Sequence, residues 1–112
     1  MRVLVTGAGG FVGRAVSKRL MQAGWTVRAL LLPNEDTEVP EGVEVVRGDI
    51  TKPETLPAAF ADCATAIHLA AITGYGVPWE ACKRVNIDGT RNVAEAAMAA
   101  GRFADEIVPV TI

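Results

Sequence analysis

The sequence predicts an α/β fold in which a mostly parallel sheet is covered by helices on both faces. Short uninterrupted apolar runs, the first at residues 3–5, are typical of parallel strands buried on both faces. These runs alternate with segments of helical periodicity, which is the βαβ order of such a sheet. A glycine-rich turn joins the first strand to the first helix. The length of 112 residues, half of them hydrophobic, suits a single domain spanning residues 1–112.

The first strand begins at Val3 and ends before Gly7, and a helix follows from Phe11. Its apolar residues lie three or four apart, as one helix face requires. These residues are Val12, Ala15, Val16, Leu20 and Ala23. Gly24 supplies the C-terminal stop. A second strand is expected at residues 26–32 and a third at 43–46, joined by the turn-rich connection 33–42.

The second half of the chain continues the alternation. Residues 51–62 carry two prolines and a short apolar face, which predicts a brief crossover helix, and a fourth strand follows at 66–69. After a loop at 71–78, a long helix ends at Gly101. Its stripe consists of Cys82, Val85, Gly89, Val93 and Ala96. A fifth strand at 107–112 completes the predicted sheet, and the predicted order is 3-2-1-4-5. Pro109 is acceptable in that strand if it forms an edge, through which the chain could self-associate.

Composition excludes several functions. The formal net charge is -2, with 11 Lys and Arg against 13 Asp and Glu, so no basic surface for nucleic acid is expected. No apolar run approaches the roughly 18 residues that span a bilayer, and we expect a cytoplasmic protein with no membrane partner. Cys63 and Cys82 lie in no metal-binding spacing, which favours free thiols and no metal site.

The glycine turn indicates a Rossmann-type dinucleotide site. Gly7, Gly10 and Gly13 follow a buried strand and open a helix. Gly7 suits a tight turn with positive φ, Gly10 allows the backbone to approach a diphosphate, and Gly13 allows close helix packing. The amides at the helix start would face the phosphates. A glycine triplet alone also occurs in ordinary strand-to-helix turns, so further motifs are needed.

The glycine turn is the first of four motifs that follow one another along the sequence. They are TGAGGFVG at 6–13, GDI at 48–50, HLAA at 68–71 and NIDGTRN at 86–92. With these motifs, residues 1 to about 97 resemble the extended short-chain dehydrogenase/reductase family, which includes NAD-dependent epimerases and dehydratases and dihydroflavonol-reductase-like enzymes. The resemblance implies a Rossmann-type three-layer fold and a dinucleotide cofactor, NAD or NADP, as the partner.

The resemblance also implies which residues bind the cofactor. Asp49 would accept a hydrogen bond from the adenine amino group, and Asn86 would lie under the active-site floor. The full implied set is Gly7, Gly10, Phe11, Val12, Gly13, Asp49, Ile50, Leu69, Ala70, Ala71 and Asn86. Each has a plainer alternative: Asp49 could cap a turn, the residues from Leu69 to Ala71 could be core, and Asn86 could tie its helix to a loop. We interpret His68 as structural.

The choice between NAD and NADP stays open at the end of the second strand. An acid there would bind the ribose hydroxyls and an arginine would bind a 2′-phosphate, but this chain has Leu32, which can do neither. Glu35 or Asp36 could reach the ribose, and Arg14 could reach a phosphate. All three are also compatible with solvated surface positions.

The family's catalytic Tyr-x-x-x-Lys pair is absent. Tyr75 is the one tyrosine and is followed four residues later by Trp79, while the one serine, Ser17, lies in the first helix. No catalytic residue is therefore predicted. We expect an NAD(P)-binding domain of an epimerase, dehydratase or reductase that is inactive alone and lacks the family's substrate-binding part. The alternatives are a non-catalytic dinucleotide-binding module and a truncated or chimeric gene product, since residues 98–112 are similar to a thiolase segment.

Overall fold

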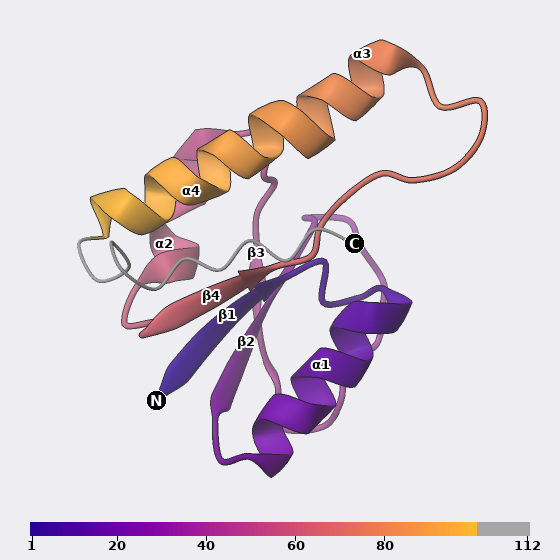
Figure 1. Ribbon diagram of the computed structural model, residues 1–112. Coiled ribbons are helices and arrows are strands. Elements are labelled where there is room, and N and C mark those ends of the chain that lie inside the picture. The colour runs from indigo at the N-terminus through magenta and orange to yellow at the C-terminus, as the bar shows by residue number, and fades with distance from the viewer. Residues whose placement is uncertain (101–112) are drawn as a thin grey trace.

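The computed structural model describes residues 1–100, which contain a four-stranded parallel sheet (Figure 1). The strands are β1 (Arg2–Thr6), β2 (Thr26–Leu31), β3 (Glu44–Arg47) and β4 (Thr65–His68). Their order is β3-β2-β1-β4, which confirms the α/β class and the first four positions of the predicted order. The predicted fifth strand, residues 107–112, lies outside the described residues. Each later strand differs from its predicted bounds by one residue, so Leu32 and Leu69 lie just beyond strand ends.

The first strand lies inside the sheet. Leu4 pairs with Arg28 of β2 on one side and with Ala66 of β4 on the other. Val3, Leu4 and Val5 have no exposed surface. A strand with neighbours on both edges and helices on both faces has no side that favours polar residues, which explains its continuous apolar run.

Helices cover both faces of the sheet and make three layers (Figure 1). α1 (Phe11–Gln22) covers one face, and α2 (Pro57–Phe60) and α4 (Gly89–Ala99) cover the other. The core on the α1 side is built from Val3, Val5, Ala8, Val27 and Ala29, with Leu20 and Met21 packed against it. The core on the other side includes Leu4, Leu30, Leu56, Phe60, Val93 and Ala97. Successive residues of β1 thus supply opposite cores, as strand geometry requires.

The face of α1 that meets the sheet was predicted only in part, since Leu20 packs against the core as expected but other residues of the predicted stripe do not. Val12 is 37% exposed, and Ala15 and Ala23 are also exposed. The buried residues of the helix are Gly13 and Ser17. Their small side chains let the helix approach the sheet, and the Ser17 hydroxyl donates to the Gly13 carbonyl oxygen over 2.8 Å, so it is not left unpaired. Hydrophobic periodicity missed these two positions because it gives no weight to glycine and serine.

The crossover between β3 and β4 is shorter than the predicted helix at 51–62. It consists of a 3-10 turn, η1 (Pro53–Thr55), and the single turn α2. Each turn begins with a proline, whose missing N–H and fixed φ suit the first helical position. Because the two prolines each begin a new turn only four residues apart, the segment forms two short turns and no continuous helix.

The predicted long helix is interrupted by a wider turn. It begins with α3 (Trp79–Cys82), continues as the π-helical stretch η2 (Lys83–Asp88) and ends with α4. The buried stripe is as predicted in α4, where Gly89 and Val93 face the sheet. π-helical segments are uncommon and often mark functional positions, and this one contains Asn86.

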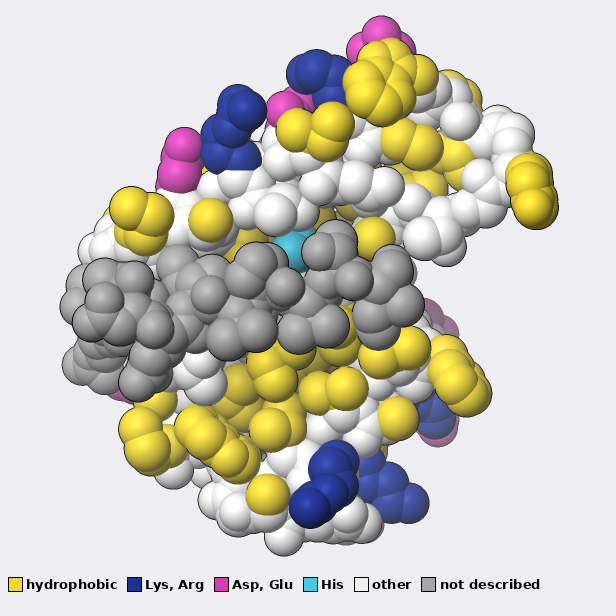
Figure 2. All heavy atoms as spheres, in the orientation of Figure 1, with side chains coloured by type: hydrophobic (Ala, Val, Ile, Leu, Met, Phe, Trp, Pro, Cys, Tyr) yellow, Lys and Arg dark blue, Asp and Glu magenta, His cyan; other side chains and the backbone are white. Residues whose placement is uncertain are grey.

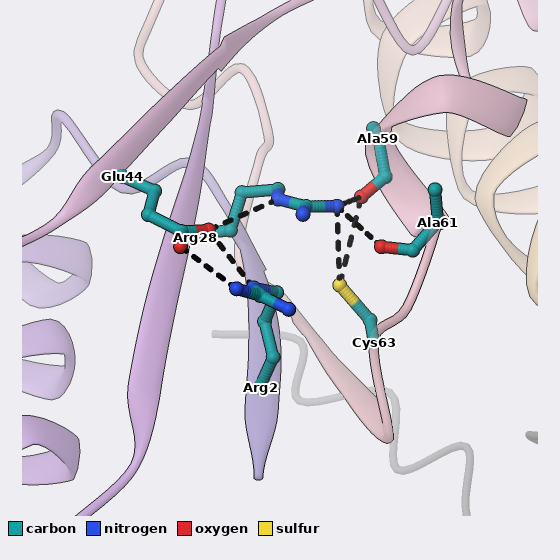
Figure 3. Close-up of polar contacts among 6 residues, drawn as sticks. All are labelled: Arg2, Arg28, Glu44, Ala59, Ala61 and Cys63. Atoms are coloured by element: carbon teal, nitrogen blue, oxygen red, sulfur yellow. Dashed lines mark hydrogen bonds and ion pairs between the residues drawn. The ribbon is translucent and has the colours of Figure 1, made fainter.

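Charged side chains lie at the amino-terminal end of the sheet (Figure 3). Arg2 donates two hydrogen bonds of 2.9 Å to the Glu44 carboxylate, and Arg28 donates a longer one of 3.4 Å. The hydrogen bond from Arg2 lowers the pKa of Glu44. Arg28 also donates to the carbonyl oxygens of Ala59 and Ala61, over 2.9 and 2.7 Å. The cluster ties the start of the sheet to the end of α2, at the opposite end from the glycine turn.

Candidate cofactor-binding site

Gly7 turns the chain away from β1. Its φ of +67° is in the left-handed region that favours glycine. A Cβ at this position would lie 2.7 Å from backbone atoms of both Leu69 and Ala70. The Gly7 carbonyl oxygen accepts a 3.1 Å hydrogen bond from the Gly10 amide, which closes the turn. Gly7 therefore has the positive φ predicted for it, and its lack of a side chain also lets the turn approach the segment after β4.

The other two glycines of the motif differ in what surrounds them. A Cβ at Gly13 would overlap the Gly7 carbonyl oxygen and lie 2.7 Å from the Ala8 Cα, so Gly13 packs against the turn. A Cβ at Gly10 would have the Gly7 oxygen as its nearest atom, at 3.4 Å, which is ordinary contact. The protein itself does not require a glycine at position 10. The free space beside Gly10 is part of a surface depression.

Two depressions meet at the glycine turn. The larger, which we call the cleft, has a volume of about 450 Å³, and the smaller, the hollow, has about 220 Å³. The cleft is lined by Thr6, Gly7, Gly10, Leu30, Leu32, Glu35, Gly48, Asp49, Ile50, Thr51, Leu69, Ala70, Ala71, Ile72, Arg84 and Val85. The hollow is lined by Gly7, Gly10, Phe11, Val12, Gly13, Leu69, Ala71 and Thr73. Figure 2 shows the surface indented between the loop after β4 and the start of α1.

The predicted site residues gather in these two depressions. All of them except Asn86 line the cleft, the hollow or both. Gly7, Gly10, Leu69 and Ala71 line both, so the glycine turn and the end of β4 form the ridge between them. Ligands of open parallel sheets bind beyond the carboxyl ends of the strands, which is where these residues lie.

Asp49 follows β3 and is held in a tight turn. Its Oδ1 accepts from the Thr51 amide over 2.9 Å and from the Thr51 hydroxyl over 2.7 Å. Partial burial alone would raise the pKa of Asp49, but the hydrogen bonds from Thr51, with the charges of Lys52 and Arg84, outweigh it and lower the pKa. The carboxylate is thus ionised at neutral pH. This geometry is that of the predicted turn-capping role, which uses Oδ1. It leaves the second oxygen, Oδ2, available for the predicted contact with adenine.

Ile50, in the loop after β3, is held in place by contacts from α4. Its carbonyl oxygen accepts a 2.8 Å hydrogen bond from the Asn92 side chain. A Cβ at Gly89 would lie 2.7 Å from the Ile50 Cδ1, so the start of α4 packs directly on this side chain. Ile50 is only 6% exposed and contributes one wall of the cleft.

His68 connects β1 to α4. Its Nδ1 is 2.6 Å from the Thr6 hydroxyl, and its Nε2 is 3.0 Å from the Thr90 hydroxyl. The Thr90 hydroxyl donates its proton to the Asn86 carbonyl oxygen over 2.7 Å, so it accepts from the imidazole, and Nε2 carries the hydrogen. Nδ1 then accepts from Thr6. Burial lowers the pKa of His68 and favours this neutral form.

Thr6 completes the floor of the site. Its Oγ1 accepts hydrogen bonds from the amides of Leu69 and Ala70, over 3.0 and 3.2 Å, while its proton goes to His68. The backbone that forms the ridge between the depressions is thereby tied to β1. This agrees with the structural interpretation of His68.

Asn86 clamps the loop after β4. Its Oδ1 accepts from the Ile72 amide over 2.8 Å, and its Nδ2 donates to the Ile72 carbonyl oxygen over 2.9 Å. The side-chain amide is therefore paired in both directions with one residue of the cleft wall. This is the geometry of the alternative in which Asn86 ties its helix to a neighbouring loop.

Some lining residues were not predicted from the sequence. Thr6 lies in the cleft as a buried polar residue at a strand end, a signal that could have identified it. Arg84 and Val85 reach the cleft from η2, and no sequence pattern distinguishes them from other helix residues. Of the residues considered for cofactor choice, Glu35 lines the cleft, whereas Asp36 and Arg14 do not.

The hydroxyl groups considered for catalysis lie outside both depressions. Tyr75 is fully exposed on the loop before α3, and Ser17 is buried with its hydroxyl bonded to Gly13. Within residues 1–100, no group of His, Cys, Asp and Glu is placed to hold a metal ion. No helix in the same range is long and apolar enough to cross a membrane.

Comparison with known families gives one match over most of the chain. The sequence model of the NAD-dependent epimerase/dehydratase family matches residues 3–105. Among curated proteins, the chain is 39% identical over 105 residues to a ceramide reductase of Caulobacter vibrioides and covers 32% of that protein's length. It is 37% identical over 103 residues to an L-arabinose 1-dehydrogenase of Haloferax volcanii and covers 37% of it. Each alignment includes 88% of this chain.

Solved structures give the same result. The UDP-glucose 4-epimerase of Thermus thermophilus in complex with NAD superposes with a TM-score of 0.79 at 33% identity, over 91% of this chain and 35% of that one. A uronate dehydrogenase of Agrobacterium tumefaciens, whose Y136A mutant was solved with NAD, superposes with a TM-score of 0.75 at 35% identity, over 89% of this chain and 37% of that one. The chain spans about a third of the length of these relatives.

Proposed function

Because the chain belongs to the NAD-dependent epimerase/dehydratase family and forms its NAD(P)-binding domain, we propose that the dinucleotide lies across the glycine turn. The adenosine half occupies the cleft and the nicotinamide half occupies the hollow. The observation that carries this proposal is that both depressions share the ridge made by Gly7, Gly10, Leu69 and Ala71. A diphosphate over that ridge joins one depression to the other.

The start of α1 binds the diphosphate. The first amides of a helix have no partner within it, and Phe11, Val12 and Gly13, which carry those amides in α1, line the hollow beside the ridge. Gly10 supplies the space, since a side chain there would extend into the cleft and the hollow. A helix N-terminus contributes at most about 2 kcal/mol per charge, whereas micromolar affinity requires about 8 kcal/mol. The adenosine and nicotinamide contacts supply the remainder.

The adenine ring lies against the loop after β3. Asp49 is ionised and has its Oδ1 occupied by Thr51, so Oδ2 accepts from the adenine amino group. Ile50 forms the adjacent apolar wall. The predicted capping role and the predicted binding role of Asp49 then use different oxygens of one carboxylate.

The nicotinamide side is built from the start of α1 and the segment after β4. Phe11 and Val12 line the hollow on one side, and Ala71 and Thr73 line it on the other. Asn86 acts as a positioning residue here, because it holds Ile72, between Ala71 and Thr73, by two hydrogen bonds. It supports the cofactor without touching it.

The bound dinucleotide would supply hydride transfer. The curated relatives include a reductase and a dehydrogenase, and we propose that the complete protein oxidises or reduces a carbon bearing oxygen. The described residues orient the cofactor and bury its diphosphate. Proton transfer and substrate recognition belong to residues outside them, since neither Tyr75 nor Ser17 lines the site.

Titration with NADH tests the proposal. We expect the chain to enhance or shift NADH fluorescence saturably, and isothermal calorimetry to give the same dissociation constant. Gly10→Val should abolish this binding while leaving the thermal unfolding curve in place, because a Cβ at position 10 meets only the Gly7 oxygen at 3.4 Å. Ala15→Val is the matched control, since Ala15 is exposed on α1 and lines neither depression. Absence of saturable binding at millimolar NADH and NADPH, or unchanged affinity in Gly10→Val, would overturn the proposal.

A further inference from the structure

The residue after β2 cannot recognise the adenosine ribose. β2 ends at Leu31, and Leu32 lines the cleft with an apolar side chain that is 49% exposed. A ribose hydroxyl needs a hydrogen-bond partner, and a 2′-phosphate needs a cation. Leu32 offers neither. Two acidic residues share the cleft with Gly7 and Gly10: Asp49, at the adenine end, and Glu35, three positions beyond Leu32 along the chain.

A tight turn returns Glu35 to the strand end. The Glu35 amide donates to the Leu32 carbonyl oxygen over 3.1 Å, and the Glu35 Oε1 accepts from the Leu32 amide, also over 3.1 Å. The carboxylate thus lies beside the position that an acid at the end of β2 would occupy. One oxygen is fixed by the backbone, and the other, Oε2, points toward the glycine turn.

Gly9 leaves room for this second oxygen because it has no side chain. A Cβ at Gly9 would overlap the Glu35 Oε2 and lie 3.0 Å from the Thr37 Cγ2. Gly9 is not one of the three motif glycines, so the geometry of the turn does not by itself explain why a glycine stands at this position. Its lack of a side chain allows the carboxylate to approach the cleft edge of the turn.

Arg47 holds the turn from β3. Its Nη1 donates to the carbonyl oxygens of Leu32 and Glu35, over 3.0 and 2.6 Å. The contact is with the backbone, and among residues 1–100 no cation forms an ion pair with the Glu35 carboxylate. Within the described residues, no salt bridge therefore neutralises this side chain, which lines the cleft.

We propose that Glu35 selects NAD over NADP. This rests on the proposed function, because it requires the adenosine half in the cleft. The Glu35 Oε2 accepts from the ribose hydroxyls of NAD, whereas the 2′-phosphate of NADP brings like charge against it. Arg47 and Gly9 are positioning residues, the first by fixing the turn and the second by making room.

The test compares dissociation constants for NADH and NADPH. We expect the unaltered chain to bind NADH at least about tenfold more tightly than NADPH, which corresponds to about 1.4 kcal/mol. Glu35→Gln should remove most of this preference, chiefly by strengthening NADPH binding. Arg47→Gln and Gly9→Ala should each reduce the preference without abolishing NADH binding. Glu38→Gln, which removes the same charge at an exposed position outside the cleft, is the matched control.

Three results would overturn the proposal. One is tighter binding of NADPH by the unaltered chain, and another is an unchanged preference in Glu35→Gln. The third is a loss of NADPH binding alone in Arg47→Gln, which would make Arg47 the reader of a 2′-phosphate. Unchanged unfolding temperatures show that the variants remain folded. If neither cofactor binds the unaltered chain, the proposed function itself fails. That outcome is distinguishable from binding of both cofactors without preference, which would refute only the role of Glu35.

Discussion

Thr6 and His68 are joined by a 2.6 Å hydrogen bond between their side chains, at the carboxyl ends of the neighbouring strands β1 and β4. The same Thr6 oxygen accepts the amides of Leu69 and Ala70, so the pair fixes the backbone of the cofactor site. If the His68 Nδ1 were protonated, it could no longer accept the hydrogen bond from the Thr6 hydroxyl, and two hydrogens would face each other. The site floor therefore depends on a neutral imidazole.

The stability of the fold should decrease as the pH falls below neutrality. Burial lowers the pKa of His68 in the folded state, so the unfolded chain binds its proton first. Stability from the neutral imidazole is complete above the unfolded pKa of about 6.5 and declines as pH falls below it. Urea unfolding at about pH 7.5 and about pH 5.5 measures the change.

His68→Gln supplies the control for this dependence. His68 is the one histidine of the chain, so its replacement removes the side chain that titrates in this interval. The variant should be less stable at both pH values but should lose little further stability at the lower one. An equal decline in the variant would contradict the prediction.

Gly13→Ala should destabilise the fold, whereas Gly10→Ala should not. A Cβ at Gly13 would overlap the Gly7 carbonyl oxygen and lie 2.7 Å from the Ala8 Cα, and both of these neighbours are backbone atoms that cannot move aside cheaply. Overpacking of this kind costs about 1–3 kcal/mol. At Gly10 the nearest atom is at 3.4 Å. Urea unfolding of the two variants gives the comparison, and equal stabilities would show that the turn relaxes around position 13.

The sequence predicted the sheet because the signals that determine it are local. A buried parallel strand requires an apolar run, and the turn after β1 requires glycines at 7 and 13, whose Cβ atoms would overlap backbone. The buried face of α1 was predicted one position away from Gly13 and Ser17. Hydrophobic periodicity counts apolar side chains, whereas close packing here selects small ones.

The partners in the contacts that complete the site could not be named from the sequence because these contacts join distant segments. An attachment of Asn86 to a loop was one of the alternatives, but its partner Ile72 and the π-helical stretch that carries Asn86 were indicated by no pattern. The position of Glu35 depends on a turn closed by its own side chain and held by Arg47 of another strand. Sequence analysis could name Glu35 and Asp36 as candidates but could not choose between them.

The two cysteines should differ in reactivity. Cys63 has no exposed surface, and burial raises the pKa of its thiol, which keeps it protonated and weakly nucleophilic. It also lies beside Arg28, with 3.6 Å between Sγ and Nη1 (Figure 3). Cys82 is partly exposed. Reaction with a thiol reagent should label one cysteine quickly and the second only in denaturant.

Cys82→Ser identifies the fast thiol. The variant should lose the fast phase and keep the one that appears on unfolding. Equal rates for both cysteines in the native protein would show that the region around Cys63 opens readily, contrary to its burial in the core with Ala59 and Phe60 of α2.

Asn86→Ala should lower both stability and cofactor affinity. The substitution leaves the Ile72 amide and carbonyl without their partners, which costs about 1–3 kcal/mol for groups shielded from water. The loop between Ala71 and Thr73 then loses its attachment to η2, so the wall of the hollow is no longer preorganised. Urea unfolding measures the first effect and NADH titration the second.

Two further variants separate these effects. Glu95→Ala changes an exposed residue of α4 outside the site and should alter neither measurement. Asn86→Asp keeps an acceptor for the Ile72 amide but sets a carboxylate oxygen against the Ile72 carbonyl, so it should not restore binding. Full NADH affinity in Asn86→Ala, despite reduced stability, would show that the loop adopts its binding conformation unaided. In that case the clamp would serve the fold alone.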